Sequence, residues 1–244
     1  MAAACLAILT AFAGLGGVRA VEKAPAPVDL FLQAKITIDP EGRVSDLAWI
    51  EADPGKLGVA RLVEPRVRSL EFVPGALDGV PATTETALRM VLRATPVPGG
   101  SWEIAIRSAT TGAATEAMAA PYYPPAALRD RVEAEVVSEI EIDVDGRATV
   151  VSATFDSGGG GARMRDAFMK ASKQAIAQWR FVPERVGGHA VAGRMRVPIG
   201  FCLGGGAWCQ VRTLERAAQG MAADQPVPLD SVARLKTDLS GVGI

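Results

Sequence analysis

The chain has 244 residues and an apolar fraction of 49%, which is enough to build a sizeable core in one or two domains. Its formal net charge of −1 argues against a nucleic-acid partner, because such partners attract strongly basic domains. After residue 20, no segment is long and apolar enough to span a bilayer.

The N-terminal segment reads as an export signal. Residues 2–18 are an uninterrupted run of apolar and small residues, and Val18-Arg19-Ala20 follows with small residues at the two positions that a signal protease reads. We therefore expect residues 1–20 to be a signal peptide cleaved after Ala20. A retained membrane anchor is the alternative, although the run is short and rich in Gly and Ala. A buried helix of a soluble protein is a third interpretation.

Residues 21–109 carry a strand, turn and strand pattern followed by an interrupted helix. The run Ile36-Thr37-Ile38-Asp39-Pro40-Glu41-Gly42-Arg43 predicts the turn between two strands. Pro65 lies in the helix region, which we expect to be short or broken. Trp102, Ile104 and Ile106 alternate within 101–109 and predict a further strand. Residues 110–120 are rich in Thr, Ala and Gly, which predicts a linker.

The segment after this linker has the clearest periodicity. Asp145-Gly146 lies between two runs with alternating apolar residues, which is a strong local signal for a β-hairpin. We expect one face of the first strand to carry Val136, Ser138, Ile140 and Ile142, and one face of the second to carry Thr149, Val151, Ala153 and Phe155.

A helix and a third strand follow the hairpin. Residues spaced by three and four form one apolar stripe, namely Met164, Phe168, Ala171, Ala175 and Trp179. We expect this helix to run to Trp179-Arg180-Phe181-Val182 and to stop at Pro183. Residues 191–201 alternate again. Since Pro198 cannot donate to a ladder, this strand is predicted to lie at a sheet edge. The result is one antiparallel sheet with a helix on one face.

The C-terminal segment contains a cysteine pair and a tail. Cys202 and Cys209 flank a Gly-rich loop, and we expect them to form a disulfide in an oxidising compartment. Two buried, unpaired thiols are the alternative. Residues 207–244 form the tail, in which 211–223 is predicted to be a short helix that ends before Pro226 and Pro228.

The sequence offers no catalytic constellation. His189 is the single histidine, and it stands alone in a Gly-Gly-His turn, so neither a zinc site nor a Ser-His-Asp triad is expected. Gly158–Gly161 has neither the dinucleotide-binding spacing nor the Lys of a phosphate loop. We expect no catalytic residue, no metal and no cofactor. Arg194 and Arg196 either guard a strand edge against aggregation or bind an acidic partner.

The order of these motifs resembles the C-terminal domain of TonB, the periplasmic energy transducer of Gram-negative bacteria. The motifs are Tyr123-Pro-Pro-Ala-Ala-Leu, Ile142-Asp-Val-Asp-Gly-Arg147, Trp179-Arg-Phe-Val-Pro183 and Val197-Pro198-Ile199. The resemblance covers about a third of the chain and departs from the family locally, at Val132-Glu133-Ala134 and at Gly158–Gly161.

The first unit resembles the second in the order of its motifs. Ile36–Arg43 parallels Ile140–Arg147, and Leu70-Glu71-Phe72-Val73-Pro74 parallels 179–183. This self-similarity favours a duplicated domain. The predicted fold is therefore α+β, with two TonB C-terminal-like units: a degenerate one in 21–109 and a complete one in 121–206. Each is a small antiparallel sheet covered by a helix.

The resemblance implies a periplasmic module that binds protein through its last strand, as the family pairs this strand with a short peptide of an outer-membrane transporter. The implied partner-binding residues are Arg194, Met195, Arg196, Val197, Pro198 and Ile199. The implied core residues are Tyr123, Phe168, Trp179 and Phe181. The partner would be a TonB-dependent outer-membrane transporter or another envelope protein. No membrane span is expected after signal cleavage, and homodimerisation is left open.

This chain differs from a typical transducer because it has no long Pro-rich spacer; its 16 prolines are scattered. A soluble periplasmic protein with a TonB-like fold therefore fits better than an energy transducer. The alternative is an envelope enzyme or structural protein that uses the same fold. The first unit contains no nucleophile–base pair, which disfavours an enzyme.

Overall fold

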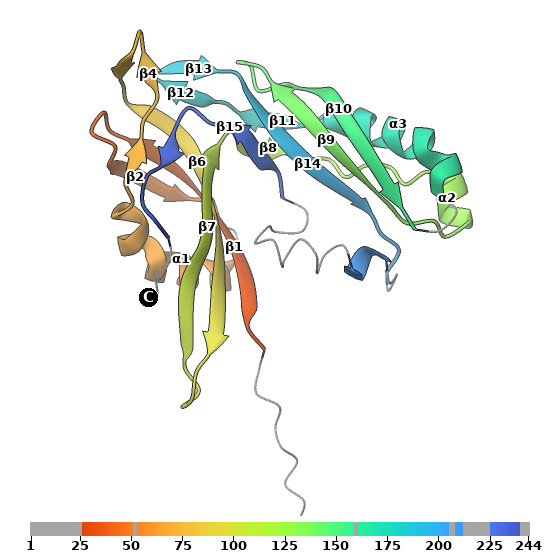
Figure 1. Cartoon of the computed structure of the whole chain (residues 1–244), viewed down its shortest axis with the longest axis horizontal. Coiled ribbons are helices and arrows are strands. Elements are labelled where there is room, and N and C mark those ends of the chain that lie inside the picture. Colours follow the sequence, from red (N-terminus) through yellow and green to blue (C-terminus); the bar gives the residue numbers. More distant parts are fainter. Residues whose placement is uncertain (1–25, 51–52, 159–160, 205–207, 212–224, 240–244) are drawn as a thin grey trace, which may run out of the picture.

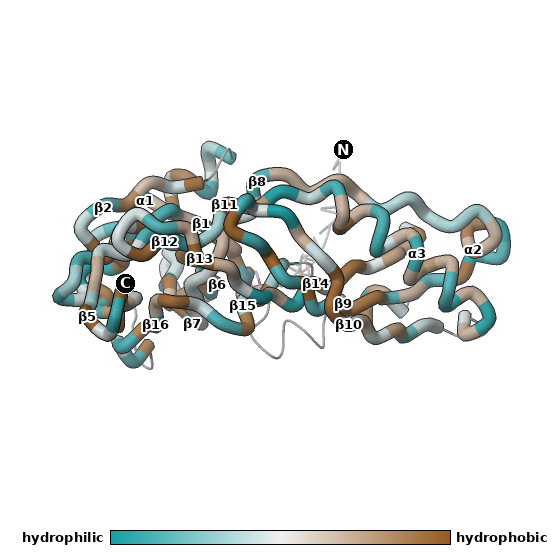
Figure 2. Tube along the Cα trace, turned by 90° about the horizontal axis from the view of Figure 1, so that it is seen from above, coloured by the Kyte–Doolittle hydropathy of each residue, from teal (hydrophilic) through white to brown (hydrophobic). Residues whose placement is uncertain are grey.

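The computed structural model describes residues 26–50, 53–158, 161–204, 208–211 and 225–239. The expected signal peptide and its cleavage position lie outside the described residues, as does the expected tail helix beyond Val211. Two units lie side by side along the long axis of the molecule, with α1 in one and α3 in the other (Figures 1 and 2). The architecture is α+β, as predicted.

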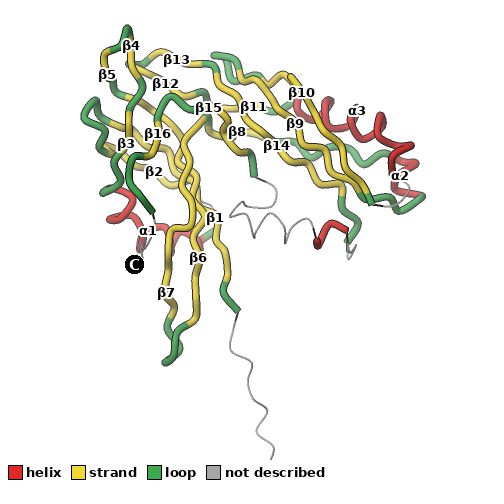
Figure 3. The backbone as a smooth tube through the Cα atoms, in the orientation of Figure 1, coloured by secondary structure: helices red, strands yellow, loops and turns green. Residues whose placement is uncertain are grey.

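The first unit is built on a sheet with the order β13-β12-β6-β1-β2, in which β7 also pairs with β6. Its elements, in chain order, are β1 (Val28–Ile38), β2 (Val44–Trp49), α1 (Pro54–Arg68), β3 (Phe72–Val73), β4 (Ala76–Leu77), β5 (Val80–Pro81), β6 (Thr84–Pro96), β7 (Trp102–Gly112) and β8 (Ala114–Ala117). Strands β1, β6 and β7 continue as a ribbon that projects from the body (Figure 3). The alternating segment at 102–106 is therefore the predicted further strand, β7.

The second unit is a four-stranded sheet with the order β10-β9-β14-β15, and α3 packs on β9 and β10. Its elements are α2 (Pro125–Arg129), β9 (Ala134–Ile142), β10 (Ala148–Ser157), η1 (Gly161–Met164), α3 (Arg165–Ile176), β11 (Arg180–Val182), β12 (Glu184–Val186), β13 (His189–Val191) and β14 (Gly193–Phe201). The tail adds β15 (Val227–Asp230) and β16 (Arg234–Leu235).

Four strand pairings connect the parts of the chain. Strand β12 of the second unit pairs with β6 of the first, and β11 pairs with β8. The tail pairs with both units, because β15 lies beside β14 and β16 beside β3. The second unit and the tail therefore complete the edges of the first unit.

Each unit has its own apolar core. The core of the second unit contains Phe168, Trp179 and Phe181, with exposed fractions of 0%, 2% and 3%. Tyr123 packs against it from the rim, in edge contact with Phe168 at 5.9 Å between ring centroids. Trp179 also donates its indole N–H to the Ala119 carbonyl at 2.8 Å. Since burying large aromatics stabilises a domain by several kcal/mol, these side chains hold α3 on its sheet.

The same contact closes the hairpin turn in both units. In the second unit, the Phe181 amide donates to the Gly146 carbonyl at 3.0 Å; in the first, the Phe72 amide donates to the Gly42 carbonyl at 2.8 Å. Both glycines have positive φ, +78° for Gly146 and +89° for Gly42. A Cβ at Gly146 would lie 1.9 Å from the Phe181 carbonyl oxygen, and one at Gly42 would lie 2.1 Å from that of Phe72. Only glycine fits both demands.

Two expectations for the region before the second unit are wrong. The segment 110–120 is not irregular, because it contains the end of β7 and all of β8. The helix containing Pro65 is neither short nor broken, since α1 runs from Pro54 to Arg68. Asp53 caps its N-terminus, and Ala60, Val63 and Val67 are buried. Pro65 lies close to the C-terminal end, where the loss of one backbone hydrogen bond disturbs little of the helix.

Two expectations within the second unit are also corrected. The helix ends at Ile176 rather than at Pro183, because 180–182 form β11 beside β8. The second hairpin strand does not keep one apolar face. A β-bulge between Val150 and Ser152 shifts the alternation, so Ala153 and Phe155 pack on the core whereas Val151 is 61% exposed.

Gly146→Ala should destabilise the protein more than Gly188→Ala. Gly188 also has a positive φ, +82°, but no atom lies within 4 Å of its Cβ position. Gly188→Ala, the control, therefore has only the cost of backbone strain, about 1 kcal/mol. Gly146→Ala has the same strain and also a clash with the Phe181 backbone, so it should cost about 2 kcal/mol more. Urea denaturation measures both. Equal midpoints would show that the turn can move away from Phe181.

Candidate functional site

Strand β14 is an edge strand along only part of its length. One side pairs with β9 from Gly193 to Phe201. The other side pairs with β15 at Arg194, Met195 and Arg196. Beyond Arg196, the described residues provide no strand beside Val197–Phe201. This second half of the strand is the candidate functional site, and we call it the open edge.

The backbone of the open edge can be oriented from one hydrogen bond. The Arg194 amide donates to Asp230 Oδ1 at 2.5 Å, so its N–H points to the β15 side. Backbone groups of alternate residues in an antiparallel strand point to the same side. Pro198 and Gly200 therefore present their backbone groups along the open edge. Pro198 lacks an N–H and is tolerated here because β9 requires no donor from it.

The side chains of β14 alternate between the core and the outer face. Met195, Val197 and Ile199 are buried, with exposed fractions of 1%, 0% and 6%. Arg194 and Arg196 point to the outer face. Their guanidinium groups lie 2.8 Å from Asp230 Oδ2 and 2.9 Å from Glu139 Oε1. The hydrogen bond from Arg196 is the main cause that holds the pKa of Glu139 below its usual value, and the hydrogen bond from Ser152 is the second. The two arginines thus have intramolecular partners.

The predicted edge therefore needs correction at its first three residues. Arg194, Met195 and Arg196 are not a free edge, because the tail strand β15 pairs with them. The tail reaches this position through Pro228, which fits at the sheet rim because its missing N–H leaves no donor unpaired. Val197, Pro198 and Ile199 retain the predicted edge geometry within the described part of the chain.

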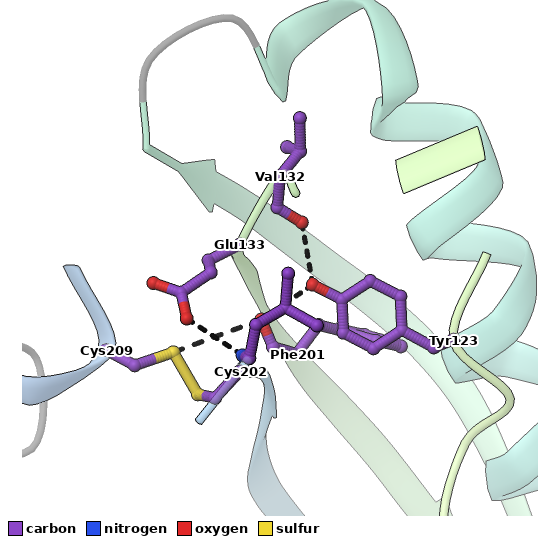
Figure 4. The surroundings of a disulfide bond; sticks show 7 residues. Tyr123, Val132, Glu133, Phe201, Cys202 and Cys209 are labelled. Atoms are coloured by element: carbon purple, nitrogen blue, oxygen red, sulfur yellow. Dashed lines mark hydrogen bonds between the residues drawn. A yellow bond between two sulfur atoms is a disulfide. The ribbon is translucent and has the colours of Figure 1, made fainter. Parts of the chain in front are cut away.

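A disulfide lies at the end of the open edge (Figure 4). Cys202 and Cys209 are joined, as the sequence predicts, with their Cα atoms 5.9 Å apart. The Leu203 amide donates to Glu133 Oε1 at 2.8 Å. The Tyr123 hydroxyl donates to the Val132 carbonyl at 2.7 Å. Burial is the main cause that raises the pKa of Tyr123, and the negative charge of Glu133 adds to it. These contacts fix the point at which the chain leaves β14.

A buried carboxylate joins the two units and the tail. Glu184 on β12 is 5% exposed and accepts the hydroxyls of Thr86 at 2.6 Å and Ser231 at 2.7 Å, and the Val232 amide at 3.1 Å. Arg89 is 4% exposed and donates to the Ala113 carbonyl. Burial lowers the pKa of Arg89 to about 10, against the opposing attraction of Glu184. We call Glu184 and its three donors the junction.

A cleft of about 250 Å³ lies beside the junction, between β1, β2 and β6 and the segment 182–185. Lys35, Asp46, Glu85 and Arg185 stand around it. His189 is exposed on β13. Among the residues that the structure describes, no group of His, Cys, Asp and Glu could hold a metal ion. In the same residues, no helix is both long and apolar enough to cross a bilayer.

Comparison with known proteins relates the second unit to one family. Residues 119–203 match the family model described as Gram-negative bacterial TonB protein C-terminal. An 83-residue stretch is 40% identical to protein TonB of Xanthomonas campestris pv. campestris strain B100 and covers 34% of each chain. A 93-residue stretch is 32% identical to protein TonB of Vibrio cholerae, and it covers 38% of this chain and 36% of that protein.

Residues 119–203 belong to the TonB C-terminal family. The predicted resemblance is confirmed for this part of the chain, and it includes all of β9, α3 and β14. The chain matches about a third of the length of these TonB proteins. The first unit and the tail lie outside the matched stretches of the family model.

Sequence reasoning missed Glu184, Arg89 and Asp230. Glu184 follows Pro183 in a short strand, and no local pattern separates it from a solvated carboxylate. Arg89 offered a weak signal, because it interrupts the apolar run of β6 without a neighbouring acid. Asp230 pairs across 36 residues of chain, a separation that no local periodicity reports.

Glu184→Ala should destabilise the protein by about 3 kcal/mol, because it removes the acceptor that the buried Thr86 hydroxyl shares with the half-buried Ser231 hydroxyl and Val232 amide. Glu85→Ala is the matched control: Glu85 is an exposed carboxylate on the neighbouring β6, and its removal should change stability by no more than about 0.5 kcal/mol. The free energy of unfolding in urea compares the two. Similar small losses would show that water replaces the carboxylate and that the junction is dispensable.

Proposed function

We propose that this chain is an exported periplasmic protein whose TonB C-terminal domain binds an extended segment of another envelope protein along the open edge of β14. The observation that carries the proposal is that, within the described residues, no strand pairs with Val197–Phe201 of the family domain on the side of β14 away from β9. Strand addition uses main-chain hydrogen bonds for affinity and side-chain pockets for specificity. It requires no catalytic group.

The geometry of the site supports this mode of binding. The open edge lies in line with β15, so an incoming segment would extend the sheet beyond the tail strand. Its Pro198 and Gly200 carbonyls and its Gly200 amide are the groups that such a segment would pair with. The buried Val197 and Ile199 side chains, together with the disulfide at Cys202, hold the strand straight in advance of binding. A preformed edge loses less entropy when it binds.

The partner class and the compartment rest on the family and on the disulfide. A TonB-dependent outer-membrane transporter is the partner that the family resemblance implies. The Cys202–Cys209 bond suits an oxidising compartment such as the periplasm. Energy transduction itself is not part of the proposal, since the match covers only about a third of each TonB protein. We further propose that the protein is not an enzyme.

We also propose that the first unit is a degenerate copy of the TonB C-terminal domain. Both units run in the order strand, strand, helix, short strands, strand, and the three long strands are arranged as β2-β1-β6 and β10-β9-β14. The turn contact between Gly42 and Phe72 recurs between Gly146 and Phe181. In both units a side chain at the turn glycine would clash with the backbone of the matching phenylalanine. The same constraint at matching places supports common descent more than a chance likeness of two hairpins.

Gly200→Pro should weaken partner binding, whereas Gly200→Ala should not. Proline removes the amide that the open edge offers, and alanine keeps it while adding a methyl group. The loss of one hydrogen bond predicts a roughly fivefold to tenfold rise in Kd for a transporter peptide, measured by isothermal titration calorimetry. Thermal unfolding of both variants checks the fold. Peptide affinity that is unchanged in a folded Gly200→Pro variant would place the binding site elsewhere.

A further inference from the structure

The second unit separates its charges between two faces. Residues 161–180, which contain η1 and α3, carry five cations and one carboxylate, Asp166. Residues 133–145, which contain β9 and its turn, carry six carboxylates and no cation. Helix α3 packs on one face of the sheet, and the alternation of β9 directs Glu135, Glu139 and Glu141 to the other face. The net charge of −1 for the whole chain conceals this separation.

The cations of α3 are exposed and mostly unpaired. Lys170 and Lys173 stand three residues apart on the solvent side of the helix, where side chains at this spacing are neighbours. Arg165 is exposed at the first turn. Among the described residues, no carboxylate forms an ion pair with any of these three. Within the described part of the chain, Arg163 is the one cation of residues 161–180 in an ion pair, with Asp130 at 2.7 Å.

The neighbouring segment adds the groups that interfacial proteins combine with cations. Arg129 and Arg131 are exposed at the end of α2, which contacts η1. Leu128 is 51% exposed and Tyr122 is 76% exposed. Amphipathic surfaces that bind lipid place apolar and aromatic side chains among Lys and Arg. None of the cations on α3 or at the end of α2 lines the cleft beside the junction. They therefore do not surround a small-molecule pocket there.

We propose that the basic face, formed by α3 and the end of α2, binds the anionic headgroups of a phospholipid bilayer. Charge complementarity carries the assignment: flexible ammonium and guanidinium groups spread over a convex helix match a dispersed layer of phosphates. The carboxylates of β9 lie on the opposite face of the sheet and would be held away from the bilayer, which would orient the domain. This proposal is independent of strand addition at β14.

The test is flotation of the full chain with two kinds of vesicle, pure phosphatidylcholine and phosphatidylcholine containing phosphatidylglycerol. Residues 2–18 are apolar and would partition equally into both, so the readout is the ratio of the two affinities. The wild-type ratio should favour the anionic vesicles and should fall as salt is added. The variant Lys170→Glu/Lys173→Glu should lower that ratio roughly tenfold or more, since each basic group near such a surface contributes about fivefold.

A matched variant separates the face from the net charge. Arg61→Glu/Arg107→Glu makes the same change of charge at exposed positions of the first unit and should keep the ratio within about twofold. Circular dichroism verifies folding, and Lys170→Gln/Lys173→Gln provides a milder second variant with the same expected direction. Equal binding of the wild type to both vesicles, or an equal loss in the two reversed variants, would overturn the assignment of the face to lipid.

Discussion

The arrangement of the whole molecule depends on one buried carboxylate, that of Glu184. It accepts a hydroxyl from β6 of the first unit and both a hydroxyl and an amide from the tail. A buried carboxylate without donors would be strongly disfavoured, so the Glu184 carboxylate is satisfied only when the three segments come together. The junction thereby positions Asp230 one residue before Ser231, and Asp230 is the residue that binds Arg194. How much of β14 is covered is thus decided outside the TonB-like domain.

The last long strand of each unit, β6 in the first and β14 in the second, differs in how much of its outer edge is paired. In the first unit, β12 pairs with the start of β6 and β7 pairs with the rest, so that edge is occupied along its length. In the second unit, β15 pairs with the start of β14, and the described residues leave Val197–Phe201 without a strand on that same side. An exposed edge invites association with other chains, and natural proteins normally cover it. The difference is consistent with a first unit that serves as scaffold and a second that keeps an edge for a partner.

Local pattern was enough to predict much of this fold, but not its long-range closure. The alternation of 134–142 and the stripe through Phe168 and Trp179 identified the second sheet and its helix, because burial imposes those periods. The bulge at Val151 could not be seen, since one inserted residue shifts the phase without changing composition. Pro65 does not break α1 because the cost of a proline depends on its distance from the helix end. The pairing of β15 with β14 spans more than 30 residues and depends on the junction, whose acceptor and donors come from three distant segments.

The open edge and the basic face can bind their partners at the same time, because the edge faces along the plane of the sheet and the basic face lies perpendicular to that plane. Hydrogen bonds to an added strand would lie in the plane of the sheet, whereas α3 covers one face of it. A domain resting on a bilayer through α3 would therefore keep β14 accessible from the side. The two interactions also respond differently to conditions. Headgroup binding weakens with salt because it depends on exposed charges, whereas strand addition depends on short-range main-chain contacts. Salt should thus detach the domain from lipid without releasing a strand already paired at Val197–Phe201.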